Sequence, residues 1–159
     1  MITTFASCNV SRSKTKEKSM KMIYSEIVSK NIVKDQTDKV WNKLIAFGGT
    51  EKFAPKLIEK VIVEGKGIGA VRYIHLKGGG EIIERLTKID STNHQMEFII
   101  ISTPMPISNY TGIFFVDHIS NNKCEVTFTS KFNVSKENKN EMKSVIKGFQ
   151  ETFISNLDK

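Results

Sequence analysis

The sequence has few of the residues from which disulfide frameworks and metal sites are built. Its two cysteines, Cys8 and Cys124, form no spaced pattern, and the three histidines, His75, His94 and His118, lie far apart. Disulfide scaffolds and zinc sites both need several such residues at short, regular spacing. We therefore expect no metal and no other cofactor, and a reduced, cytoplasmic setting.

Long hydrophobic runs are missing as well. The longest apolar stretch, residues 98–101, has the length of a strand, whereas a membrane-spanning helix needs about 20 apolar residues. Residues 1–19 lack the apolar segment of a secretory signal, so we interpret them as a loosely ordered tail before a domain at 20–159. A mitochondrial presequence is the less favoured interpretation, although no acidic residue precedes Glu17.

The chain has an excess of positive charge, but that charge is dispersed. Lys and Arg number 24 against 17 Asp and Glu, which gives a net charge of +7. Acidic residues are interleaved with most of the basic ones, and no strand alternates aromatic and basic residues as RNA-binding strands do. A solvated basic face is therefore favoured over nucleic-acid binding. A chain of 159 residues, 39% of them hydrophobic, is sufficient for one soluble domain.

Most of the sequence has the two-residue period of β-strands. A strand is predicted at 21–33, and six more are predicted at 57–64, 69–77, 81–89, 95–102, 108–119 and 124–134. The links between these six contain Gly, Asn, Asp or Ser and are mostly short, which favours antiparallel neighbours. The result is a seven-stranded antiparallel sheet.

Helical spacing occurs in three places. After Asp35, a candidate N-cap, Val40, Trp41 and Leu44 form one apolar face of a first helix that ends at Gly48-Gly49. A short second helix is expected at 50–54. A long closing helix is predicted at 136–157, with Ser135 as its cap and with a continuous apolar stripe: Met142, Val145, Ile146, Phe149, Phe153, Ile154 and Leu157.

The predicted fold class is α+β. A curved seven-stranded antiparallel sheet wraps around a long C-terminal helix, with two short helices after the first strand. One face of such a sheet must be covered, and the closing helix is the obvious cover. A strongly twisted sheet curling around one helix leaves space between them, which favours a ligand cavity.

In residues 22–157 the chain resembles the START-like superfamily, also called SRPBCC, helix-grip or Bet v 1-like, and within it the polyketide cyclase/dehydrase and lipid transport group. The resemblance is carried by an ordered set of short motifs and by the closing helix: Val40-Trp41, Phe47-Gly48, Phe53 with Pro55, Gly67-x-Gly69-x-x-Arg72, Glu84-Arg85-Leu86, and Pro106 with Tyr110. The chain departs from the hormone receptors of this fold, because Met105-Pro106-Ile107 replaces their latch histidine and Ile58 replaces their clamping lysine. A hormone-receptor role is therefore not expected.

The resemblance implies a hydrophobic cavity with a few polar contacts. It places Glu84 and Tyr110 on the concave face, and strand alternation then brings Arg72 within reach of Glu84. A charge buried alone is costly, so these two residues should pair with each other or with a ligand. A purely structural charge pair is the equally favoured alternative. The predicted ligand-binding residues are Arg72, Ile74, Leu76, Glu84, Phe98, Tyr110, Phe128, Phe149 and Phe153, and no catalytic residue is assigned.

The expected function is binding of a small hydrophobic or amphipathic molecule, such as a lipid or polyketide. One alternative is a polyketide cyclase or aromatase, in which Glu84 and Tyr110 would act on the same bound molecule. The other is a protein-interaction or chaperone-cofactor module, or a homodimer. That alternative rests on apolar residues expected on the outer face: Ile83, Ile99, Ile101, Ile113 and Phe115.

Overall fold

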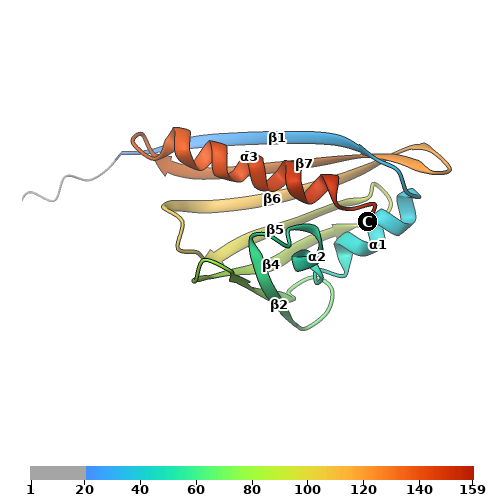
Figure 1. The fold of residues 1–159 in the computed structure, drawn as a ribbon, viewed down its shortest axis with the longest axis horizontal. Helices are drawn as coiled ribbons and strands as arrows, with labels where there is room; N and C mark the ends of the chain where they lie inside the picture. Colours follow the sequence, from blue (N-terminus) through green and yellow to red (C-terminus); the bar gives the residue numbers. More distant parts are fainter. Residues whose placement is uncertain (1–20) are drawn as a thin grey trace, which may run out of the picture.

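The computed structural model describes residues 21–159, so the predicted tail at 1–19 lies outside the described residues (Figure 1). The predicted order of elements is confirmed. Along the chain these are β1 (Met22–Val33), α1 (Thr37–Ile45), α2 (Thr50–Phe53), β2 (Ile58–Glu64), β3 (Val71–Leu76), β4 (Glu81–Asp90), β5 (Gln95–Ser102), β6 (Ile107–Ser120), β7 (Lys123–Ser135) and α3 (Lys139–Ser155).

The seven strands form one antiparallel sheet in the order β1-β7-β6-β5-β4-β3-β2. Strands β2 to β7 follow one another as a meander, and β1 pairs with the last of them. Because β1 and β2 lie at opposite edges, the chain crosses between the edges through α1 and α2. Helix α3 runs along β1 and β7 on the inner side of the sheet (Figure 1). The predicted fold class is thus confirmed.

Two predicted helix caps are wrong. Helix α1 begins after Gln36, and the Asp35 carboxylate instead accepts a hydrogen bond from the Gln36 N–H and lies 3.3 Å from Lys43 Nζ. Those contacts hold the pKa of Asp35 below its usual range, the Gln36 hydrogen bond most of all. Residues 136–138 form a turn, in which Ser135 Oγ accepts from the Asn138 N–H, so α3 begins only at Lys139.

Most residues of the apolar faces predicted for the helices are buried, but Val145 of the predicted α3 stripe is 49% exposed. Val40, Trp41 and Leu44 of α1 join the main core, as do Met142 and Ile146 of α3. A smaller apolar cluster lies near α2, where Ala54 packs with Ile58 and Ile74. None of the helices in residues 21–159 is long and apolar enough to cross a membrane.

Aromatic rings fill the layer between the middle of the sheet and the C-terminal half of α3. The rings of Phe114 and Phe128 have centroids 4.0 Å apart, and Phe114 lies 5.4 Å from Phe153 of α3. Phe98 stacks 6.1 Å from Phe114. All four side chains are buried, so this part of the interior is densely packed.

Candidate functional site

The predicted ion pair between Arg72 and Glu84 is present. The two residues are directly opposite each other on β3 and β4, and both side chains point to the inner face. Arg72 Nε lies 2.5 Å from Glu84 Oε2, and Arg72 Nη1 donates to the Phe47 carbonyl and to Thr50 Oγ1 at 3.3 and 3.1 Å. The guanidinium therefore joins the sheet to the segment between α1 and α2.

Aromatic rings complete the surroundings of this pair. The guanidinium carbon of Arg72 lies 4.2 Å from the centre of the Phe47 ring and 5.0 Å from that of Phe98, which are cation–π distances. Burial raises the pKa of the Glu84 carboxyl, and the neighbouring Arg72 charge opposes that rise. Because these partners of Arg72 are groups of the protein itself, the geometry favours a structural charge pair over a free anion receptor.

Tyr110 belongs to a separate polar cluster. Its hydroxyl lies 2.6 Å from Ser130 Oγ on β7. The Gln150 side chain on α3 donates from Nε2 to Ser130 Oγ at 2.8 Å and accepts at Oε1 from the Ser29 hydroxyl at 2.7 Å. A continuous chain of buried hydrogen bonds thus links β6, β7, α3 and β1.

Burial is the main influence on the Tyr110 phenol. It raises the pKa of Tyr110 well above the usual range, the Ser130 hydrogen bond opposes that rise, and the smaller effects of the Glu84 and Arg72 charges act in opposite directions. The phenol is therefore neutral wherever the protein is folded near neutral pH. Tyr110 and Glu84 have different hydrogen-bond partners, Ser130 and Arg72 respectively.

Gln150 and Ser29 were missed by sequence reasoning. Gln150 lies on the buried face of α3, within its apolar stripe, and its side chain is fully buried. A lone amide within an apolar stripe is the one signal that the sequence offers, because a buried amide requires hydrogen-bond partners. Ser29 lies on the inward face of β1, where alternation alone could have placed it.

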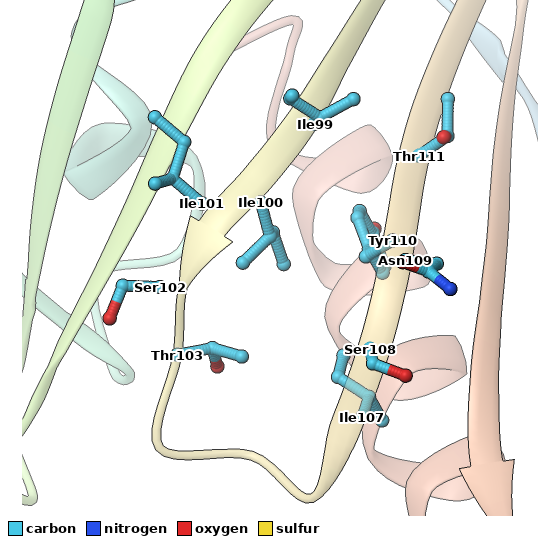
Figure 2. A pocket seen from close by; sticks show the side chains of 10 residues that line it. All are labelled: Ile99, Ile100, Ile101, Ser102, Thr103, Ile107, Ser108, Asn109, Tyr110 and Thr111. Atoms are coloured by element: carbon cyan, nitrogen blue, oxygen red, sulfur yellow. The ribbon is translucent and has the colours of Figure 1, made fainter. Parts of the chain in front are cut away.

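A groove opens where β5 and β6 separate. Their pairing ends at Ile99 and Thr111, although both strands continue past that point. A bulge in β6 sets two residues, Asn109 and Tyr110, opposite Phe132 of β7, and Asn109 has a φ of 50°. The resulting groove has a volume of about 620 Å³ and lies at the end of β5 and the start of β6, with α3 behind it (Figure 2).

The walls of this groove combine four isoleucines with six residues that carry hydroxyl or amide groups. Figure 2 shows its ten lining residues, which are Ile99, Ile100, Ile101, Ser102, Thr103, Ile107, Ser108, Asn109, Tyr110 and Thr111. Tyr110 alone among the nine predicted ligand-binding residues belongs to this lining. It is also the residue that connects the groove with the buried hydrogen-bond chain.

The other predicted ligand-binding residues lie deeper or further along the sheet. Phe98, Phe128 and Phe153 are part of the packed aromatic core, and Phe149 is half-buried at its margin. Ile74 and Leu76 belong to the smaller cluster near α2. Ligand contact by these side chains stays a prediction.

A second, smaller hollow of about 360 Å³ lies between the end of α1 and the β2–β3 turn. Asn42, Ile45 and Phe47 line it from the α1 side, and Val63 and Lys66 line it from the β2 side. The β3–β4 turn lies beside the β5–β6 connection, because a Cβ added to Gly80 would lie 3.3 Å from Pro104.

Comparison with known proteins identifies the family of this chain and solved structures that share its fold. The family model for polyketide cyclase / dehydrase and lipid transport matches residues 28–159. The chain belongs to this family. No curated protein matches it. The suspected resemblance is thereby confirmed at the level of family and fold.

Solved structures related to the chain share its fold at low sequence identity. An uncharacterized protein from Bacillus thuringiensis is 20% identical with a TM-score of 0.74, over 84% of this chain and 96% of the other. The Zhui aromatase/cyclase from Streptomyces sp. R1128 is 15% identical with a TM-score of 0.74, over 85% and 92%. Norcoclaurine synthase from Thalictrum flavum is 14% identical with a TM-score of 0.70, over 98% and 96%.

Proposed function

We propose that this member of the polyketide cyclase/dehydrase and lipid transport family binds a small hydrophobic or amphipathic molecule through the groove between β5 and β6. The observation that carries this proposal is the groove itself. Four isoleucines line it together with six residues that have polar side chains, and of these six only Tyr110 is buried. Sites for small molecules combine apolar walls with a few fixed polar groups in this way.

Burial of apolar surface supplies the affinity. A ligand that removes about 250 Å² of apolar surface from water gains roughly 6 kcal/mol at 25 cal/mol per Å², before the cost of association is subtracted. The groove volume of about 620 Å³ falls within the range of pockets that hold such ligands.

Acid–base catalysis, the cyclase alternative, has weaker support. Glu84 is hydrogen-bonded to Arg72, and Tyr110 is hydrogen-bonded to Ser130, so the two groups do not share one hydrogen-bonded site.

The interaction-module alternative rests on the outer face, where Ile101 is 46% exposed. Ile83, Ile99, Ile113 and Phe115 are each partly covered.

Native mass spectrometry of freshly purified protein, followed by extraction and identification of bound small molecules, tests the proposal. Ile101→Asp places a charge in the groove, whereas Ile62→Asp places one on β2, away from the groove, at a residue of matching exposure, 45% against 46%. We expect a bound apolar molecule that is lost in the first variant and retained in the second. Equal retention in both variants, or a dimer without ligand, would contradict the proposal.

A further inference from the structure

We infer that the ligand of the groove carries an acylated amino-acid unit, –CO–NH–CHR–CO–, with an apolar side chain R. The N–H and the second carbonyl of this unit pair with the backbone of Ile100 on β5. This inference rests on the proposed function and adds the chemical class of the ligand. It follows from the direction of the β5 backbone at the point where β5 and β6 stop pairing.

One hydrogen bond at the other end of the β5–β6 pair fixes which residues of β5 turn their backbone toward β6. The Val116 N–H donates to the His94 carbonyl, and these two residues continue the register of the pair. In an antiparallel pair, opposite residues exchange hydrogen bonds at every second position. Because the register has no interruption, the N–H and C=O of Phe98 point to β6 and pair with Gly112. Those of Ile100, two residues further along β5, point the same way.

The backbone of Ile100 has no paired residue on β6. In an uninterrupted ladder Ile100 would be opposite Tyr110, but the pairing of the two strands ends at Ile99 and Thr111. Ile100 itself stays in the strand, opposite Glu84 of β4. Ile100 and Tyr110 both line the groove, and Figure 2 shows them on the two sides of the gap between the strands. The N–H and C=O of Ile100 therefore face the groove.

These two backbone groups restrict what can fill the groove. Ile100 is only half-buried, so water can hydrate its N–H and C=O while the groove is open. A molecule that covers them with apolar surface displaces that water and leaves a donor and an acceptor unpaired, which opposes binding. A ligand avoids this loss when it supplies an acceptor and a donor of its own.

An amino-acid unit supplies both groups at the required spacing. In an antiparallel pair, the donor and the acceptor opposite one residue belong to a single residue, –NH–CHR–CO–. Acylation keeps the nitrogen an uncharged donor, whereas a free amine would bring a cation against apolar walls. Opposite residues of a pair direct their side chains to the same face, so R lies on the inner face. There Ile100 and Ile107 pack against the core, and R is therefore apolar.

The unpaired edge is too short for a peptide strand. Ile101 is an extra residue in the register of β5 with β4, and β5 ends at Ser102. On β6, the bulge at Asn109 and Tyr110 interrupts the opposite edge. Bulges of this kind disrupt the ladder and bend the strand. A single amino-acid unit fits this edge, with its acyl group against the isoleucines of the groove.

N-octanoyl-leucine methylamide is a suitable probe. Its matched control is the ester in which an oxygen replaces the leucine N–H, because the ester keeps the shape and the apolar surface but lacks the donor. We expect the ester to bind roughly 2- to 12-fold more weakly in calorimetric titrations, as the loss of one hydrogen bond predicts. Both probes should lose affinity in Ile101→Asp and keep it in Ile62→Asp. Equal affinity of the wild-type protein for amide and ester would overturn the inference.

Amide hydrogen exchange tests the unpaired backbone without any ligand. The N–H groups of Phe98 and Ile100 point to the same side of β5, but only Phe98 has a paired residue on β6. We expect the Ile100 amide of the ligand-free protein to exchange at least about tenfold faster than the Phe98 amide. Saturation with the octanoyl amide should slow it. Equal protection of the two amides in the ligand-free protein would overturn the inference.

The same experiments separate failure of this inference from failure of the proposed function. If neither probe binds although mass spectrometry finds a bound apolar molecule, the amino-acid unit alone is wrong. If no molecule binds in either experiment, the proposed function fails and the inference fails with it. Tighter binding of an acetylated pentapeptide of alternating valine and threonine than of the octanoyl amide would assign the groove to a peptide strand and overturn the choice of a small ligand.

Discussion

The Phe98 ring lies directly beneath Gly112 of the neighbouring strand. The two residues are opposite each other on β5 and β6, and a Cβ added to Gly112 would collide with three carbons of the ring. Because the same ring also flanks Arg72 and stacks near Phe114, the absence of a side chain at 112 allows one aromatic ring to serve both the core and the ion pair.

Gly112→Ala is therefore expected to lower the free energy of unfolding by about 1–3 kcal/mol, as overpacked cores do. Gly148→Ala is the matched control, because an added Cβ there meets nothing within 4 Å on an exposed part of α3. Its better helix propensity should raise the free energy of unfolding by up to about 1 kcal/mol. Chemical denaturation of both variants checks the contrast, and equal stability of the two would contradict this packing.

Removing one partner of the Arg72–Glu84 pair should be strongly destabilising. Arg72→Met or Glu84→Leu alone leaves a buried charge without its partner and is expected to cost about 3–5 kcal/mol. The double variant removes both charges and should lose clearly less than the sum of the two. A double-mutant cycle in urea measures this coupling, and additive losses would show that the two charges do not interact.

Ser25 and Ser29 offer a comparison within one strand. Both are buried on the inner face of β1, but Ser29 donates to Gln150 whereas Ser25 Oγ has no partner among the described residues. Ser29→Ala should lower the free energy of unfolding by about 1–3 kcal/mol, because the Gln150 oxygen loses its donor. Ser25→Ala should be neutral or slightly stabilising. Thermal denaturation tests the contrast, and a reversed order would contradict the hydrogen-bond chain.

Tyr110 makes the fold sensitive to alkaline pH. Since its pKa is raised in the folded state, the stabilisation is complete below the unfolded value near pH 10 and is lost as pH rises above it. The chain has three tyrosines, and the other two, Tyr24 and Tyr73, are much less buried. Absorbance titration should show two phenols that ionise in the folded protein and a third that ionises only with unfolding. Tyr110→Phe should remove that third step alone.

The ion pair was predictable from the sequence, and the groove was not. The family resemblance put Glu84 on the concave face, and strand alternation in an antiparallel meander then placed Arg72 within reach of it. The groove depends on a bulge at Asn109 that keeps Ile107 and Tyr110 on the inner side although they are three residues apart. Asn tolerates a positive φ, but the sequence does not reveal which asparagine adopts one.

The hydrogen bonds that link Tyr110, Ser130, Gln150 and Ser29 could not be predicted from the sequence, for a related reason. Gln150 meets Ser130 and Ser29 only after α3 has packed on the sheet, at sequence separations of 20 and 121 residues. No local sequence pattern predicts contacts between residues so far apart in the chain. The start of α3 was missed in a simpler way, because Ser135 caps a turn before the helix rather than the helix itself.

The most direct test of the central claim is an NMR titration of the backbone amides with prodan, a small naphthalene dye of low polarity. The account predicts that the largest chemical-shift changes fall on residues 99–103 and 107–111, which line the groove between β5 and β6. Changes centred instead on Asn42, Ala46 and Gly67, around the smaller hollow, would contradict it. So would an unchanged spectrum at saturating probe.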